Sequence, residues 1–264
     1  MLKGENMLEY IITLLVGIVA GGLGSVLGVG GGVVMLPVSE HLLGLNTPMA
    51  VGTTLFAVMF TAMTGAFAHY RQGNVQINNA LLLAAGGLLG VFSGSYIFNL
   101  YLSKNTVWLS LLLGFLFLIM TYRMGKEVFA HEQLEVTGQQ RKYSALVLML
   151  LGIIIGLITG AAGLGGGFLM VPAMIWLTGA SPFQAVGTTL LAMFPTAAVG
   201  AFTKLSQGYV ELPVALLMGL GTIIGTQIGA RVMHLINQRL FRIIFAVLLC
   251  YLAFNYLYAG LSGL

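Results

Sequence analysis

Apolar residues fill long runs along the chain, and short polar stretches separate these runs. The runs cover about 8–27, 33–45, 49–69, 77–102 and 106–123 in the first half, and about 143–162, 168–179, 183–203, 212–234 and 238–260 in the second. A helix needs roughly 20 apolar residues to cross a bilayer. Most runs therefore predict membrane-spanning helices, whereas 33–45 and 168–179 are too short to cross alone.

The pattern of the first half recurs in the second half at a constant offset. Residues 28–37 read Gly-Val-Gly-Gly-Gly-Val-Val-Met-Leu-Pro and residues 163–172 read Gly-Leu-Gly-Gly-Gly-Phe-Leu-Met-Val-Pro, an offset of 163 − 28 = 135. Gly-Thr-Thr, Gly-Ala-Phe and Gln-Gly follow at the same offset. Such self-similarity indicates an internal duplication. We expect a first transmembrane repeat over 1–123, a linker over 124–142 and a second transmembrane repeat over 143–264.

Composition places the chain among integral membrane proteins. It is 58% hydrophobic and 7% charged, with a mean hydropathy of +0.99, which excludes a soluble domain. The net charge of +4 comes mostly from Lys and Arg in the polar breaks. The positive-inside rule therefore predicts basic cytoplasmic loops, with the linker among them, and no nucleic-acid surface. We expect a multi-pass protein of the plasma membrane.

The basic residues also bear on the orientation of the two repeats. If each repeat crosses the membrane an odd number of times, eight Lys and Arg face the linker side and three the other. An even number of crossings gives seven against four. The larger bias favours repeats of opposite orientation, as in many secondary transporters.

Each short apolar run follows a run of glycines, which predicts a broken or re-entrant helix. Three consecutive glycines strongly disfavour a continuous helix. Non-helical backbone at membrane depth is tolerated where protein buries it or where it lines a wet cavity. The predicted fold is an all-α polytopic membrane protein of two homologous four-to-five-helix repeats, inverted, whose glycine-broken helices meet near the membrane midplane.

The glycine runs are candidate anion sites. A helix that opens with glycines leaves backbone N–H groups unpaired at the positive end of the helix dipole. The alternative is that the glycines only permit close helix packing. We prefer that interpretation for the glycines spaced by four, at positions 86, 90, 94, 221, 225 and 229. The substrate-binding candidates are Gly30, Gly31, Gly32, Gly165, Gly166 and Gly167.

Four threonines follow a glycine at the start of an apolar run. Their hydroxyls could complete an anion shell or cap the helix that begins there. The two roles use the same geometry, so both interpretations stay open. The candidates are Thr53, Thr54, Thr188 and Thr189.

Glu40 and His41 are ionisable residues inside the first short apolar run. The matching positions of the second repeat are Ile175 and Trp176. Ionisable groups within the membrane are costly, and histidine titrates near neutrality, so the pair is a candidate for proton coupling. An ordinary interfacial pair at the end of a short segment is the alternative.

His69 and its repeat counterpart Lys204 lie one turn before Gln72 and Gln207. These four residues are further candidates for proton coupling or gating. Alternatively, His69 and Lys204 extend to the membrane interface and serve no site.

Enzyme chemistry has no candidate residues in this chain. It contains no aspartate, so a Ser-His-Asp set is excluded, and no paired-carboxylate pattern is present. Four scattered histidines and one cysteine form no metal or disulfide pattern. We therefore expect no enzyme activity, no cofactor and no metal.

The chain contains the motif Gly-x-Gly-Gly-Gly-x4-Pro twice, and each copy is followed by Ala-Val-Gly-Thr-Thr-Leu, Gly-Ala-Phe and Gln-Gly-(Asn or Tyr)-Val. This doubled pattern resembles the TauE/SafE family of sulfite exporters and sulfonate uptake permeases. The resemblance covers both repeats. It implies a plasma-membrane transporter of sulfite or other sulfur-containing and organic anions. It also implies roles for the glycines, the threonine pairs and Gln72 and Gln207. His69 keeps the family's Ala-His-Tyr-Arg form, whereas Lys204 departs from it.

The expected function is secondary transport of a small anion, most plausibly sulfite, a sulfonate or thiosulfate. No nucleotide-binding loop is present, so we expect the energy to come from an ion gradient or from the substrate's own gradient, with protons as the expected coupling ion. A passive anion channel, a carrier of an unrelated organic anion, a carrier of uncharged or cationic cargo and an intramembrane enzyme are the alternatives. The bilayer, the anion, protons and a second copy in a homodimer are the expected partners.

Overall fold

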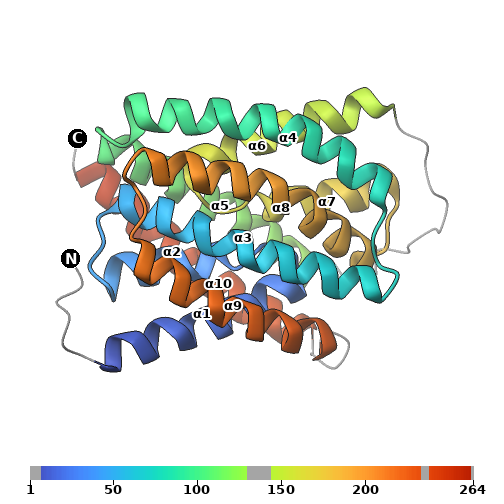
Figure 1. Cartoon of the computed structure of the whole chain (residues 1–264), viewed down its shortest axis with the longest axis horizontal. Helices are drawn as coiled ribbons and strands as arrows, with labels where there is room; N and C mark the ends of the chain where they lie inside the picture. The colour runs from blue at the N-terminus through green and yellow to red at the C-terminus, as the bar shows by residue number, and fades with distance from the viewer. Residues whose placement is uncertain (1–6, 130–143, 233–237, 263–264) are drawn as a thin grey trace.

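The computed structural model describes residues 7–129, 144–232 and 238–262, and within these ranges the chain is a bundle of helices (Figure 1). The first half contains α1 (Met7–Leu27), α2 (Gly32–His41), α3 (Thr47–Arg71), α4 (Ile77–Ile97), the π-helical turn η1 (Phe98–Leu102) and α5 (Thr106–Phe129). The second half contains α6 (Ala145–Ala162), α7 (Gly167–Thr178), α8 (Pro182–Ser206), α9 (Leu212–Val232) and α10 (Gln238–Ser262). The predicted all-α polytopic fold is confirmed.

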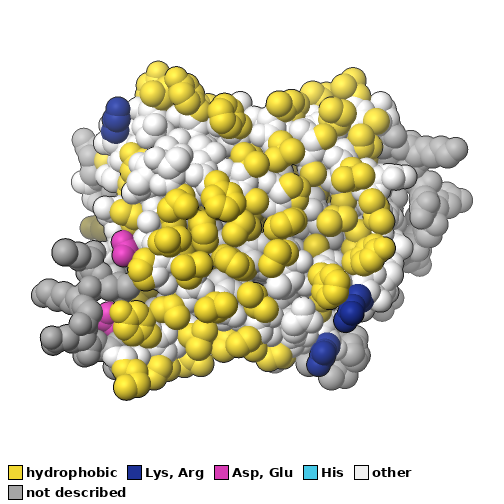
Figure 2. All heavy atoms as spheres, viewed as in Figure 1, with side chains coloured by type: hydrophobic (Ala, Val, Ile, Leu, Met, Phe, Trp, Pro, Cys, Tyr) yellow, Lys and Arg dark blue, Asp and Glu magenta, His cyan; other side chains and the backbone are white. Residues whose placement is uncertain are grey.

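Seven helices in the described part of the chain are long and apolar enough to cross a membrane, namely α1, α3, α4 with η1, α5, α6, α8 and α9. The helices α2 and α7, with 10 and 12 residues, are too short. Figure 2 shows hydrophobic side chains across the middle of one face, whereas the charged side chains lie toward its two ends. The protein is therefore a multi-pass membrane protein.

Two predicted boundaries differ from the structure. α2 ends at His41 rather than at residue 45, and Asn46 then caps α3 by accepting a hydrogen bond from the Met49 N–H at 3.0 Å. α5 continues to Phe129, inside the predicted linker 124–142. Residues 130–142 of that linker lie outside the described ranges. Polar residues at a helix end look like a linker in sequence even when the helix continues through them.

The main helix pairs join one half of the chain to the other. α1 packs on α9, α4 on α6, α5 on α10, and α3 on α8. A Cβ atom on Gly86 would overlap the Met149 carbonyl, and one on Gly225 would overlap the Ile18 carbonyl. The packing role predicted for the glycines spaced by four is confirmed at these contacts, where backbones approach closely.

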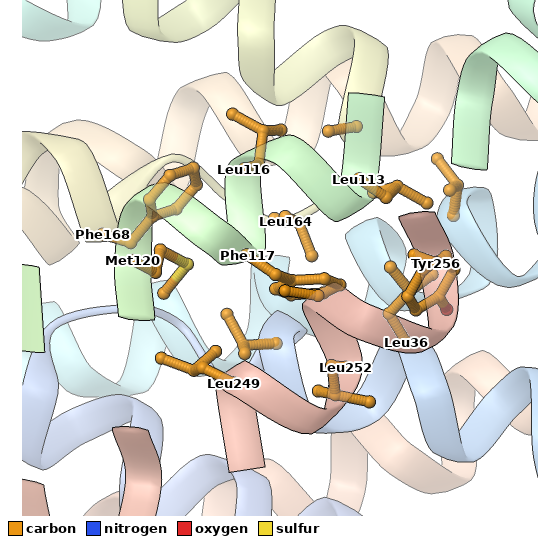
Figure 3. Close-up of a cluster of buried hydrophobic side chains, with 14 of the residues drawn as sticks. Leu36, Leu113, Leu116, Phe117, Met120, Leu164, Phe168, Leu249, Leu252 and Tyr256 are labelled. Atoms are coloured by element: carbon orange, nitrogen blue, oxygen red, sulfur yellow. The ribbon is translucent and has the colours of Figure 1, made fainter. Parts of the chain in front are cut away.

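The centre of the bundle is formed by α3 and α8, the most buried of the seven candidate spans. In Figure 1, α1, the first helix of the first half, begins at the left end of the bundle, and α6, the first helix of the second half, begins at the right. α5 and α10 lie against α2 and the second glycine motif through a cluster that includes Leu36, Phe117, Leu164 and Leu252 (Figure 3).

Candidate functional site

Both glycine motifs form the same sharp turn. After α1 ends, Gly28, Gly30 and Gly31 have φ of 69°, 79° and 76°, and α2 begins at the next residue. Glycine adopts this left-handed region without the steric penalty that a Cβ atom brings. The corresponding Gly163, Gly165 and Gly166 have φ of 72°, 83° and 71° before α7. The predicted breaks are therefore present in both halves.

The two turns meet between α3 and α8. A Cβ atom on Gly30 would lie 3.1 Å from Val58 Cγ1 and 3.4 Å from Met193 Sδ. One on Gly165 would lie 2.8 Å and 3.2 Å from the same two atoms. Val58 and Met193 are near the middle of α3 and α8, the central helices. Motifs that are far apart in the sequence thus form one structure at the centre of the bundle.

The helices that leave these turns start without a side-chain cap. Gly31 and Gly166 are the residues at the caps, and their carbonyls accept the first helical hydrogen bonds. Gly32 and Gly167 follow, and each packs against backbone of the opposite motif. Uncapped N–H groups give such helix ends a partial positive charge. The arrangement can hold the negative charge of an anion.

Thr53 and Thr188 are fully buried but do not face an open site. Their hydroxyls each accept a 2.9 Å hydrogen bond, from the Glu211 N–H and the Gln76 N–H respectively. Glu211 directly precedes α9, and Gln76 directly precedes α4. The two threonines therefore anchor connections that belong to the opposite half, a role that the sequence did not indicate.

Thr54 and Thr189 differ from their neighbours. Both are fully buried, and within the described ranges neither hydroxyl has a hydrogen-bond partner. A buried hydroxyl without a partner is uncommon in a folded protein and requires an explanation. Of the four threonine candidates, this pair is the one available to a ligand.

His69 and Lys204 are fully buried, so the interpretation that they extend to the interface is wrong. His69 Nε2 lies 3.3 Å from the Ser25 carbonyl oxygen. Lys204 Nζ lies 3.0 Å from the centroid of the Phe98 ring. Two positions 135 residues apart in the sequence thus carry different chemistry inside the bundle.

Gln72 and Gln207 hold helices of the opposite half. Gln72 Nε2 donates to the Ala230 carbonyl in α9, and Gln207 Nε2 donates to the Ser95 carbonyl in α4. The donor–acceptor distance is 3.4 Å in both bonds. The two acceptors are separated by the same offset as the two glycine motifs, since 230 − 95 = 135. The two glutamines therefore have matching structural roles at the ends of α3 and α8.

Glu40 lies apart from the glycine turns, in a pocket of about 570 Å³ where α2 ends and α3 begins. Its carboxylate accepts a hydrogen bond from the Tyr256 hydroxyl of α10. His41 lines the same pocket, is exposed, and has its ring centroid 6.5 Å from that of Tyr256. No sequence pattern pointed to Tyr256, and the residue 135 positions before it is Thr121.

Two uncapped half-helices that meet inside an apolar bundle are the arrangement found in secondary membrane transporters. The chain matches the sulfite exporter TauE/SafE family over residues 13–256, and it belongs to that family. The predicted family is therefore confirmed, and its members are transporters rather than enzymes.

Curated relatives carry the same general description. The chain is 26% identical to "Probable membrane transporter protein YunE" of Bacillus subtilis (strain 168), with 96% of this chain and 99% of the relative covered. It is 30% identical to a "Probable membrane transporter protein" of Xylella fastidiosa (strain 9a5c), with 84% and 86% covered. No solved structure matches the chain.

Proposed function

We propose that this transporter carries sulfite or a related sulfur-containing anion, such as a sulfonate or thiosulfate, across the plasma membrane, driven by a proton gradient. The observation that carries the proposal is the contact of both glycine turns with the same two side chains, Val58 and Met193. An anion between the turns would meet the positive ends of α2 and α7 together. The description of the family as sulfite exporters supports the sulfur assignment.

We also propose that the two halves form an inverted repeat with the anion site at their interface. The opposite starting ends of α1 and α6 support this (Figure 1). Alternating access in such folds moves one repeat against the other around a fixed site. Small movements of the two turns past each other would then expose the anion to one side at a time.

The linker side of the bundle is the cytoplasmic side in this proposal. Arg71 and Arg231 end α3 and α9 at one end of the bundle, where Gln72 also bonds to Ala230. Lys104 follows η1 at the far end of α4. The positive-inside rule favours a cytoplasmic location for the end with the two arginines. α5 starts beside Lys104 and runs toward that same end, so residues 124–142 follow on the cytoplasmic side.

Flux of sulfite into proteoliposomes tests the proposal. The purified full-length protein is assayed with and without an imposed proton gradient, with sulfate, thiosulfate and methanesulfonate as competitors. Saturable flux that follows the gradient is expected. Flux without saturation or trans-stimulation would identify a passive channel instead, and flux of none of these anions by folded protein would overturn the sulfur assignment.

A further inference from the structure

Lys204 is a basic side chain that lies inside the bundle rather than at its surface. The side chain is fully buried near the end of α8, and its ammonium has no hydrogen-bond partner among the residues that the structure describes. The Phe98 ring lies 3.0 Å away and attracts the cation through its π face. Such a contact offsets only part of the cost of removing an ammonium from water, which an anionic partner normally balances.

Two further buried polar groups without partners in the described ranges come from the turns next to Lys204 and Phe98. Ser95 Oγ and Gln207 Oε1 are buried, and neither has a hydrogen-bond partner in the described ranges. Ser95 is one turn before Phe98 in α4, and Gln207 is one turn after Lys204, at the end of α8. The bond from Gln207 Nε2 to the Ser95 carbonyl, 3.4 Å long, sets these two turns face to face. Three such groups together indicate a ligand that is not part of the chain.

The helix geometry changes at the same place. Phe98 is the first residue of the π-helical turn η1 that ends α4. Single π-helical turns are rare and occur frequently at functional sites. The ring that contacts Lys204 is therefore presented by a backbone irregularity rather than by a regular helix.

The equivalent place in the repeat lacks the charge arrangement. Lys204 corresponds to His69, whose Nε2 already contacts the Ser25 carbonyl, and Ser95 corresponds to Ala230. His69 Nδ1 and Ser25 Oγ are buried there without partners among the described residues, but neither supplies the three hydrogen-bond donors of a lysine ammonium. The packing of the repeat therefore does not require a lysine at position 204.

We propose that Lys204, Ser95 and Gln207 form a binding site for a small oxyanion, in which the Lys204 ammonium balances the charge of the cargo. The inference rests on the anion transport proposed above and adds the side chain that selects negative charge. The ammonium and the Ser95 hydroxyl donate to anion oxygens. Gln207 Oε1 can accept from a protonated oxygen such as that of hydrogensulfite. The site lies between the central turns and the end of the bundle where α8 meets α9.

The test compares two lysines at this end of the bundle. Lys204→Met replaces the buried ammonium with an apolar side chain of similar length, and Lys104→Met removes the same charge from an exposed position. Sulfite affinity is measured on the full chain in nanodiscs, from the sulfite-dependent rise in Tm, and by flux in proteoliposomes. We expect Lys204→Met to weaken sulfite affinity by at least about tenfold, as loss of a buried charge partner does, and Lys104→Met to leave it unchanged. Without anion, Lys204→Met should unfold at the wild-type Tm or higher.

A second variant covers the case in which Lys204→Met does not fold. Ser95→Ala removes one donor and keeps the charge, so the proposal predicts severalfold weaker sulfite affinity with an unchanged Tm. Wild-type affinity in either folded variant would overturn the site and leave the proposed transport standing. If thiosulfate or methanesulfonate raises the Tm of the wild type but not of Lys204→Met, and sulfite raises neither, the oxyanion site stands and the sulfite assignment falls. Stabilisation by chloride alone would contradict an oxyanion site. If none of the four anions raises the wild-type Tm, both the site and the sulfite assignment fall.

Discussion

The Thr53 hydroxyl of α3 accepts a 2.9 Å hydrogen bond from the backbone N–H of Glu211, 158 residues further along the chain. Thr188 makes the same bond to Gln76 in the reverse direction, from the second half to the first. Each bond satisfies an N–H just before a helix begins. The first threonine of each Gly-Thr-Thr motif thus fixes a helix start in the other half.

Replacing Thr53 with Val should destabilise the protein. The substitution keeps the shape of the side chain but leaves the partly buried Glu211 N–H without its acceptor, which costs about 1–3 kcal/mol. Thermal unfolding of the purified protein measures the loss as a lower Tm. Thr53→Ser keeps the acceptor and should unfold near the wild-type temperature. Equal Tm values for Thr53→Val and the wild type would show that the bond contributes nothing to stability.

The neighbouring Thr54 should behave in the opposite way. Its hydroxyl has no partner among the described residues, so Thr54→Val removes a buried polar group at no cost in hydrogen bonds. We expect an unchanged or slightly higher Tm together with reduced sulfite flux, because the proposed anion site uses this hydroxyl. Wild-type flux in Thr54→Val would remove this threonine from the anion shell.

A comparison of alanine substitutions at Gly31 and Gly73 separates the cost of a strained φ from the cost of crowding by an added Cβ atom. Gly31 has φ of 76°, and an added Cβ would crowd the Ala20 carbonyl, whereas Gly73 has φ of 73° and nothing within 4 Å. Gly73→Ala should cost only the left-handed penalty of about 1–2 kcal/mol. Gly31→Ala should cost more and should also abolish flux. Chemical denaturation compares the two free energies of unfolding, and equal values would contradict the close packing at the turn.

Glu40 is the residue to change if protons drive transport. Glu40→Gln keeps an oxygen that can accept the Tyr256 hydroxyl hydrogen bond but cannot release a proton. We expect sulfite flux that no longer responds to an imposed proton gradient, while exchange of sulfite down its own gradient persists. His41→Asn, a change at the exposed neighbour in the same pocket, tests the second candidate of the pair separately. A wild-type response in Glu40→Gln would assign proton coupling to another group.

The helix breaks were predictable because local chemistry determines them. Three consecutive glycines disfavour a helix in any context, so the turns before Gly32 and Gly167 follow from the sequence. The predicted ends of α2 and α5 were less accurate, because polar residues occur both at the end of a helix and in a linker.

The roles of single side chains depend on contacts that the sequence does not contain. Thr53 follows a glycine near the start of a helix, so the sequence suggests a helix cap. The structure shows instead that its hydroxyl accepts a hydrogen bond from the Glu211 N–H. The contact between Glu40 and Tyr256 joins positions 216 residues apart, and no periodicity links them. The burial of Lys204 depends in the same way on Phe98, which comes from another helix.

Helices of the first half pack mainly on helices of the second half, and this sets the order in which the protein can be assembled. A chain is synthesised from its N-terminus, so α1, α4 and α5 enter the bilayer before α9, α6 and α10 exist. Until then lipid must cover the surfaces, rich in glycine on α1 and α4, on which these partners later pack. The first half alone therefore lacks a native core. The core can be completed only after the second half has been synthesised. Quality control in the membrane would meet a half-made chain as loosely associated helices.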